Sequence, residues 1–352
     1  MHFLDDSLFP ENQQKLVIQA APYAPGFLVS DFESDIPVTM DQQIQKAVDC
    51  YNAGATVLHV HVREDDGSGS KRLSKFNEML GRLREAVPKM VLQVGGSISF
   101  APENKGDVAR WLDNDTRHAL AELNPQPDQV TIVINTNQLN FLELLSEDEI
   151  AGTSWATPEY RRAYTEMVMD STPEFYLEHL RRLQAARVQT HFMLLHLHQL
   201  ETVLRLIRRG IYAGPLNINI ACASGGAAGR DPADLIEFIR RTPDGATLTI
   251  EATMRAVIPM CTIAIALGQH VRVGIEDNFW GRKGERLTTV QQIEKMVRIA
   301  RELGREVASG DEARRIYRIG EHWSGPEETL ARLGMPPNRR PSEVGVPVRR
   351  AW

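Results

Sequence analysis

Short runs of apolar and β-branched residues recur along the chain, and segments with amphipathic helical patterns separate them. Runs with few polar positions are typical of strands that are buried on both faces, as in a parallel sheet. The pattern predicts eight strands, at residues 15–21, 56–62, 90–96, 129–135, 189–195, 215–222, 247–253 and 270–276.

Helix start and stop signals lie between these runs. Thr39 with Gln42 three residues later is a capping-box pattern, and Gly54 supplies the stop. The pair Asp231-Pro232 places a proline at the first position of another expected helix. Residues 288–304 show a further amphipathic pattern, which ends in a glycine. Strands that alternate with helices in this way predict a (β/α)8 TIM barrel.

The alternative architecture is a doubly wound open sheet. The first strand is followed by "AAPYAPG" and not by a glycine-rich dinucleotide fingerprint, which favours the barrel. We expect one α/β barrel domain at residues 1–320, with a long acidic and aromatic insertion at 137–172 after the fourth strand. Insertions of this length are commonly functional or bind a partner. We expect residues 321–352, rich in proline and arginine, to form an extended tail that packs on a neighbouring subunit.

Composition and charge narrow the class of protein. The net charge of -6 offers no basic excess for nucleic acid. No apolar run approaches the ~20 residues that a membrane helix needs, and the acidic start lacks the apolar core of a signal peptide. The three cysteines lie far apart, which argues against a disulfide framework. We therefore expect a cytoplasmic protein that binds neither nucleic acid nor membrane.

Two histidines alternate near the end of the second strand, in "VLHVHVRE". His59 and His61 project to the same side of the strand because side chains alternate along it. Glu276 ends the eighth strand, which lies near the second in a closed ring of eight. Two histidines and one glutamate are a catalytic zinc set with open positions for substrate. The alternative is that the histidines fill the barrel interior and bind no metal.

Two further charged residues accompany this set. Asp277 follows Glu276 directly and supplies a carboxylate for proton transfer. Arg272 lies near enough in sequence to orient a substrate carboxylate. These residues indicate acid–base chemistry beside a metal ion.

Three segments resemble the β-keto acid cleavage enzyme family, whose best-known activity is 3-keto-5-aminohexanoate cleavage. They are "GATVLHVHVREDDGSGS", "HVRVGIEDNFW" and "VQQIEKMVRIARELGREVAS", and the likeness covers roughly residues 15–318 in the same order of barrel units. The resemblance implies a zinc-dependent homo-oligomer, a dimer or tetramer. It also implies conversion of a β-keto acid and acetyl-CoA into acetoacetate and a new acyl-CoA.

The same resemblance implies roles for individual residues. His59, His61 and Glu276 would bind zinc, Asp277 would act as the base, and Arg272 would orient the substrate. A Lewis-acidic ion that binds a β-keto acid favours loss of its α-proton, so the set is chemically consistent.

Glycines after the sixth strand, in "ACASGGAAGRDP", are candidates for CoA contact. Gly225 and Gly226 precede a helix start, where backbone N–H groups suit phosphate oxygens. The equally weighted alternative is a flexible turn with Asp231 as the helix cap.

Three further residues at strand ends are candidates for substrate contact, namely Ser97, Asn135 and His196. His196 also forms a second H-x-H pair with His198, which suggests a competing metal site on the fifth strand. That pair lacks an acidic neighbour, and His198 falls in the expected helix, so we favour contact with substrate or a helix cap.

The fifth strand departs from the family pattern. Members carry alternating glutamates there, whereas this chain reads "THFMLLHLHQ", with His191, Met193 and His196 in their place. Because carboxylates are the natural counterions of an amino group, we predict a substrate without that group. A neutral, apolar or anionic side group fits better.

Two other functions remain open at this stage. The first is a metal-dependent aldolase or hydrolase that acts on a keto acid without CoA. The second is an inactive metal-binding regulator that uses residues 137–172 to bind a partner. The intact Arg272, Glu276 and Asp277 argue against the regulator, because a non-catalytic protein has no need of a base beside its metal.

Overall fold

The computed structural model describes residues 5–102, 104 and 106–344. Eight parallel strands form a closed barrel in the order β1–β10–β9–β8–β7–β4–β3–β2, which confirms the predicted fold. Each predicted run contains one of these strands. They are β1 (Ile18–Ala20), β2 (Val57–Val60), β3 (Val91–Val94), β4 (Gln129–Val133), β7 (Gln189–Leu194), β8 (Asn217–Cys222), β9 (Thr247–Ala252) and β10 (His270–Val273).

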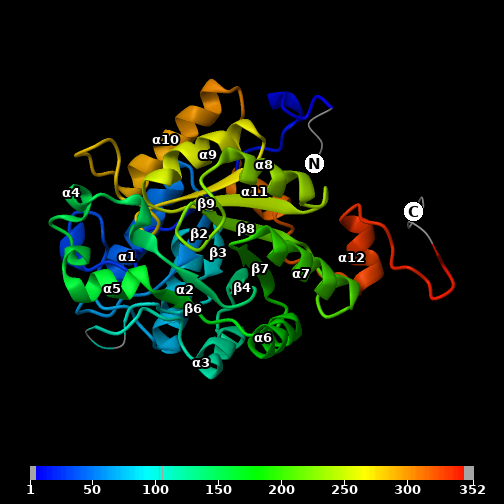
Figure 1. The fold of residues 1–352 in the computed structure, drawn as a ribbon, viewed down its shortest axis with the longest axis horizontal. Helices are drawn as coiled ribbons and strands as arrows, with labels where there is room; N and C mark the ends of the chain where they lie inside the picture. The colour runs from blue at the N-terminus through cyan, green and yellow to red at the C-terminus, as the bar shows by residue number, and fades with distance from the viewer. Residues whose placement is uncertain (1–4, 103, 105, 345–352) are drawn as a thin grey trace.

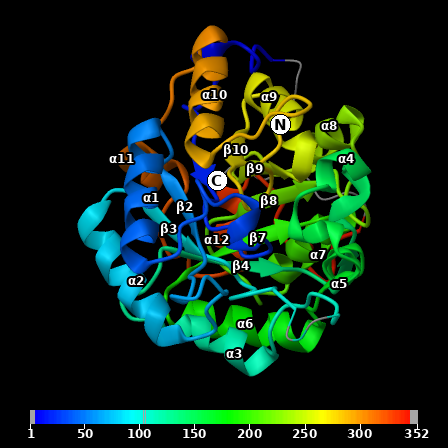
Figure 2. The same ribbon diagram turned by 90° about the vertical axis from the view of Figure 1, so that its left-hand side faces the viewer.

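Helices surround the barrel, as Figure 2 shows in a view toward one end of the strands. Local signals set their ends. Thr39 and Gln42 form the expected capping box, and Gly54 ends the first helix with a left-handed φ of 117°. The surrounding helices are α1 (Met40–Ala53), α2 (Leu73–Ala86), α3 (Asn114–His118), α6 (Pro173–Ala185), α7 (Leu197–Arg208), α8 (Pro232–Arg241), α9 (Val257–Ala266) and α10 (Thr289–Glu302).

The insertion at 137–172 has secondary structure of its own. It contains β5 (Asn137–Leu139), α4 (Glu147–Ile150), α5 (Pro158–Thr165) and β6 (Met167–Met169), and β5 pairs with β6 in antiparallel orientation. Its buried residues belong to a second hydrophobic cluster, which they share with residues from the carboxyl ends of the barrel strands. The insertion therefore covers the end of the barrel where the candidate site lies (Figure 1).

The C-terminal segment corrects one expectation. After α11 (Gly310–Ile316), residues 326–332 form α12 (Pro326–Arg332), so the prediction of an extended tail is wrong for this part. This helix contacts α7 of the same chain. Leu330 and the following Leu333 are fully buried in the hydrophobic core of the protein. Packing on a neighbouring subunit stays a prediction, and residues 345–352 lie outside the described residues.

A belt of side-chain amides crosses the inside of the barrel. Gln19 donates to Gln93 at 2.8 Å, and since β2 separates their strands, this bond must pass through the interior. Gln93 donates to Gln129 at 2.9 Å, and Gln129 donates to Gln189 at 2.7 Å. Asn217 also donates to Gln189, at 2.7 Å. We call these five residues the amide belt.

Charged and aromatic residues close the amino end of the barrel. Asp128, directly before β4, accepts hydrogen bonds from Arg84 at 2.8 Å and from Arg314 of α11 at 2.9 Å. The backbone N–H of Leu92 donates to the same carboxylate at 2.8 Å. The carbonyl of Tyr317 accepts from two members of the amide belt, at 3.1 and 3.0 Å. This end is therefore sealed by paired groups.

The described helices include none with the length and apolar character needed to cross a lipid bilayer.

Candidate active site

His59 and His61 present the same ring nitrogen to the site. The Nδ1 of His59 donates to the Oε1 of Gln93 at 2.8 Å, and the Nδ1 of His61 donates to the carbonyl of Ile98 at 2.8 Å. An amide or carbonyl oxygen can only accept, so Nδ1 carries the proton in each ring. In the neutral form of each ring, Nε2 then carries the lone pair, which is the tautomer that a metal ion needs.

Glu276 lies opposite both rings. Its Oε1 is 3.4 Å from the Nε2 of His59 and 3.5 Å from the Nε2 of His61. Its Oε2 is buried and has no hydrogen-bond partner among the described residues. Among the residues that the structure describes, this is the one group of three histidine, cysteine or acidic residues whose ligand atoms lie close enough to hold a metal, all within 4.8 Å of one another. The sequence prediction that these three side chains converge is confirmed.

Glycine at position 95 makes room for this arrangement. A Cβ atom at Gly95 would lie 2.4 Å from the Nε2 of His61 and 3.1 Å from the Nε2 of His59. Any larger residue would therefore push against both candidate ligand atoms.

Burial and neighbouring groups shift the pKa values of Glu276 and His59 downward. Burial alone would raise the pKa of Glu276, but His61, His59 and Arg272 outweigh it and hold that pKa well below its usual range. Burial and the charge of Arg272 together lower the pKa of His59 to about 4, against the opposing effect of Glu276. Both groups are in the form that binds a cation.

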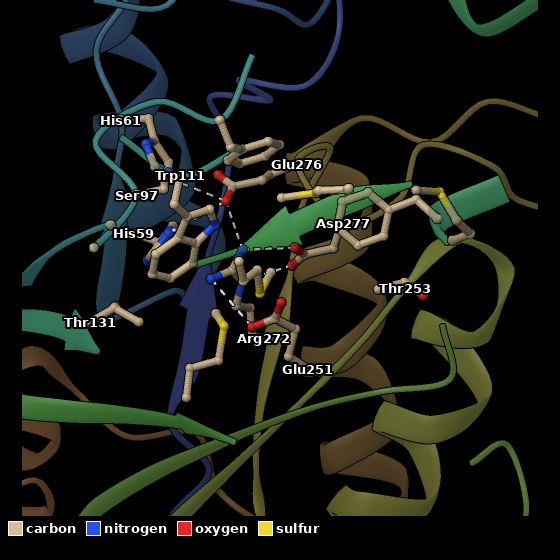
Figure 3. A pocket seen from close by; sticks show the side chains of 18 residues that line it. His59, His61, Ser97, Trp111, Thr131, Glu251, Thr253, Arg272, Glu276 and Asp277 are labelled. Carbon is tan, nitrogen blue, oxygen red and sulfur yellow. Dashed lines mark hydrogen bonds and ion pairs between the residues drawn. The ribbon is translucent and has the colours of Figure 1, made fainter. Parts of the chain in front are cut away.

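Arg272 of β10 organises the acidic side of the site (Figure 3). Its Nε and Nη2 donate to the two carboxylate oxygens of Asp277 at 2.8 and 2.7 Å. Its Nη2 also donates to Glu276 at 2.9 Å, and its Nη1 lies 3.4 Å from Glu251 of β9. Asn219 donates to the same carboxylate of Glu251. One buried guanidinium thus positions three carboxylates.

The carboxylates differ in proton affinity. Burial raises the pKa of Asp277 well above its usual range; Arg272 opposes this rise and Glu251 adds to it. Burial likewise raises the pKa of Glu251. A raised pKa makes Asp277 a stronger proton acceptor than an exposed carboxylate, which suits a general base.

These groups line one pocket, with a cavity volume of about 50 Å³. Its other lining residues are small, hydroxylic or apolar. The small and hydroxylic ones are Gly95, Gly96, Ser97, Thr131 and Thr253. The apolar ones, which we call the apolar wall, are Phe100, Trp111, Phe141, Met167, Met169, Met193 and Met254.

The candidate substrate residues lie in different places. Ser97 lines the pocket, as expected. Asn135, with a left-handed φ of 65°, and His196 are not among the described residues that line it. His196 precedes α7, which contains His198 as expected, and its Nε2 lies 2.8 Å from the carbonyl of Gly226. Their contact with substrate stays a prediction.

The glycine segment after β8 packs against the insertion. Gly225 exchanges two backbone hydrogen bonds with Asn140, of 2.8 and 3.2 Å. A Cβ atom on Gly226 would lie 2.1 Å from the carbonyl of Gln138. Asp231 accepts from the N–H of Ala233 at 2.9 Å, so it caps α8. The close packing explains the glycines, and CoA contact stays a prediction.

The sequence analysis missed several residues of the site. Glu251 is an acidic residue inside the apolar strand "TLTIEA", and an acidic residue in such a strand could have indicated a functional role. Gln93, which orients His59, belongs to a series of glutamines that recurs in strand after strand. Trp111 and Met167 lie in connecting segments with no local signal, because only the fold brings them to the pocket.

A parallel barrel with ionisable groups gathered at the carboxyl ends of its strands defines a (β/α)8-barrel enzyme. The family model for β-keto acid cleavage enzymes matches residues 15–319. The chain belongs to this family.

Comparisons with individual proteins agree. The chain is 27% identical to 3-keto-5-aminohexanoate cleavage enzyme of Acetoanaerobium sticklandii, over 88% of this chain and all of the relative. It is 24% identical to 3-dehydrocarnitine:acetyl-CoA trimethylamine transferase of Rhizobium meliloti, over 87% of this chain and 97% of the relative. Among solved structures, apo ObcA superposes with a TM-score of 0.60 at 12% identity, covering 81% of this chain and 66% of ObcA, which shows the fold alone.

Proposed function

We propose that this protein cleaves a β-keto acid with acetyl-CoA as co-substrate, giving acetoacetate and a new acyl-CoA. The observation that carries the proposal is the convergence of His59, His61 and Glu276 beside an Arg272–Asp277 pair at the carboxyl end of the barrel. The family match and the acetyl-CoA transferase named among the relatives support this reaction.

His59, His61 and Glu276 would hold a divalent ion, for which we propose zinc. The donor set fits, since two imidazoles and one carboxylate are common zinc ligands and leave an open position. The buried Oε2 of Glu276 has no partner among the described residues, as expected for an atom reserved for a ligand. When bound, such an ion supplies Lewis-acid polarisation of a keto oxygen.

The residues of the chain then bind, orient and move a proton. Arg272 fixes both oxygens of Asp277, so this carboxylate is aimed without freedom to rotate. Asp277 removes a proton from C2 of the β-keto acid and returns one when the product forms. Ser97 and Thr131 offer hydroxyl groups within the same pocket for the substrate carboxylate.

C2 of the β-keto acid forms a bond to the acetyl carbonyl carbon, and the CoA thiolate leaves. The thiolate then attacks C3 of the original keto acid, the C2–C3 bond breaks, and the electron pair on C2 takes up a proton. The products are acetoacetate and the CoA thioester of the side group, so no oxidant or reductant is needed.

The decisive experiment follows carbon from acetyl-CoA. Zinc-loaded protein is incubated with a β-keto acid and with acetyl-CoA labelled with ¹³C in both acetyl carbons. The proposal expects label at C3 and C4 of acetoacetate and none in the new acyl-CoA. Release of a free carboxylic acid, or cleavage without any CoA, would establish the aldolase or hydrolase alternative and overturn the proposal.

Two broader predictions belong with this function. We propose a cytoplasmic enzyme that assembles as a dimer or tetramer. Light scattering coupled to size-exclusion chromatography measures the assembly, and a monomer at micromolar concentration would contradict it.

A further inference from the structure

The pocket combines two kinds of lining residue. The ionisable groups bind one another through Arg272. The apolar wall makes up most of the remaining lining, with four thioethers from Met167, Met169, Met193 and Met254. A β-keto acid whose reacting carbons lie at the ionisable groups therefore directs its side group against apolar residues.

The insertion builds part of the wall and is held in place. In β6, Met167 and Met169 alternate with the half-buried Val168, so both methionines face the pocket. The backbone N–H of Trp111 donates to the carbonyl of Val168 at 3.3 Å, and the backbone N–H of Val168 donates to the carbonyl of Ala109 at 2.9 Å. Trp111 and β6 therefore form one continuous surface.

The wall offers no counterion to a charged side group. Apart from the two histidines, Arg272 is the only basic side chain among the described lining residues, and three carboxylates already engage it. The lining carboxylates are the same three. An anionic group buried against thioethers and rings would lack a partner, and such burial is strongly unfavourable. A cationic group would find only the faces of Phe100, Trp111 and Phe141.

A second positive charge lies behind the wall. Arg117 is fully buried, with its guanidinium 5.7 Å from the centre of the Trp111 ring and 3.6 Å from that of Phe175. Burial lowers the pKa of Arg117 to about 10, so it stays charged at neutral pH. The guanidinium disfavours a cationic side group in front of Trp111, and Arg117 is not among the described residues that line the pocket.

One polar atom of the wall is free for a ligand. The Nε1 of Trp111 is buried and has no hydrogen-bond partner among the described residues. A single neutral N–H suits a neutral acceptor such as a carbonyl oxygen, whereas a carboxylate needs several donors or a cation.

We infer that the substrate carries a short, uncharged and largely hydrocarbon side group, which packs on the apolar wall. This inference rests on the proposed function, and it narrows the sequence prediction by excluding an anionic group. Flexible methionines adapt to alkyl chains of different shape, so we expect tolerance among short alkyl groups. The insertion, which supplies Phe141, Met167 and Met169, thereby contributes to the choice of substrate.

The test measures binding separately from turnover. 3-Hydroxyhexanoate, 3-hydroxyadipate and carnitine are non-reacting analogues with a neutral, an anionic and a cationic end, and isothermal titration calorimetry on zinc-loaded protein gives their affinities. We expect 3-hydroxyhexanoate to bind at least about tenfold more tightly than the other two. Equal or tighter binding of either charged analogue, or no binding of any of the three, overturns the inference.

Variants at Met169 sharpen the test. Met169→Lys should reverse the order toward 3-hydroxyadipate, while the matched Met169→Leu, which conserves volume and charge, should retain the wild-type order. Thermal unfolding checks that both variants fold. If Met169→Lys does not fold, the affinities of the wild-type protein for the three analogues decide the test. Turnover separates the two proposals: acetoacetate formed best from a charged β-keto acid refutes only this inference, whereas no acetoacetate from any β-keto acid refutes the function.

Discussion

At the amino end of the barrel, the carboxylate of Asp128 accepts hydrogen bonds from two arginines and a backbone N–H. At the carboxyl end, Arg272 also binds carboxylates, but several polar atoms around it make no hydrogen bond. The Oε2 of Glu276, the Nη1 of Arg272 and the Nε1 of Trp111 are all buried and lack a hydrogen bond among the described residues. The carboxylate of Asp128 is thus fully engaged, whereas Glu276 and Arg272 keep buried atoms that a ligand could satisfy.

The difference separates stability from function. A buried polar atom without a partner costs about 1–3 kcal/mol, so a fold tolerates a cluster of them where a ligand completes the bonds. We interpret the amino end as the part that stabilises the barrel and the carboxyl end as the part that binds. The amide belt connects the two, because Gln93 is bonded both to the belt and to His59.

Loss of a candidate metal ligand should have the largest effect. Glu276→Gln removes the charge that faces both imidazoles, and we expect activity to fall by more than about 10⁴-fold. Inductively coupled plasma mass spectrometry on the purified variant should find well under one zinc per chain. Full zinc occupancy in the variant would show that Glu276 is not a ligand.

Loss of the base should leave the metal in place. Asp277→Asn keeps the shape of the side chain but cannot take a proton, and we expect kcat to fall by about 10³-fold. Zinc content and the affinity for 3-hydroxyhexanoate should change little. Exchange of the substrate C2 protons with D₂O, followed by NMR, should slow in parallel with kcat; exchange at the wild-type rate would assign the base elsewhere.

At the amino end, Asp128→Asn should cost stability and spare the chemistry. Removing the charge between Arg84 and Arg314 should lower the free energy of unfolding by about 3 kcal/mol, measured by urea denaturation. The exposed pair of Lys89 and Asp311, 2.6 Å apart, provides the control: Asp311→Asn should cost less than about 1 kcal/mol. A tenfold fall in kcat for Asp128→Asn would contradict the separation of the two ends.

The same aspartate gives a pH dependence. Burial would raise the pKa of Asp128, but hydrogen bonds from Arg314 and Arg84 outweigh it and lower that pKa. A lowered folded-state pKa stabilises the fold above the unfolded value of about 4, and this stabilisation is lost as the pH falls through the folded value. The difference in unfolding free energy between wild type and Asp128→Asn should therefore shrink below about pH 4.

The smallest effect should come from the connection between the ends. Gln93→Leu removes the acceptor that fixes the tautomer of His59, and we expect zinc affinity to fall by about 10- to 100-fold. Gln129→Leu is the matched control, because it breaks the same belt without touching His59. Competition with a fluorescent chelator measures both affinities. An equal loss in the two variants would mean that the belt acts only through stability.

Local patterns were sufficient for the barrel and for the convergence of His59, His61 and Glu276. The eight strands could be predicted because burial on both faces demands continuous apolar runs. The convergence of His59, His61 and Glu276 could be predicted for two reasons. Alternation along a strand sets the direction in which side chains point, and the carboxyl ends of parallel strands lie at the same edge of the barrel. The helix at Pro326–Arg332 was missed, although proline at a first helical position was a signal, because the composition of the segment suggested an extended chain.

The sequence by itself determined the order of strands and helices and the residues that meet at strand ends, since these follow from short-range periodicity. Only the tertiary structure decided that Gln93 holds His59, that Arg272 joins Glu251 to Asp277, and that the insertion supplies part of the apolar wall. Such contacts depend on closure of the barrel and on the register between strands, which bring together residues that are far apart in the chain.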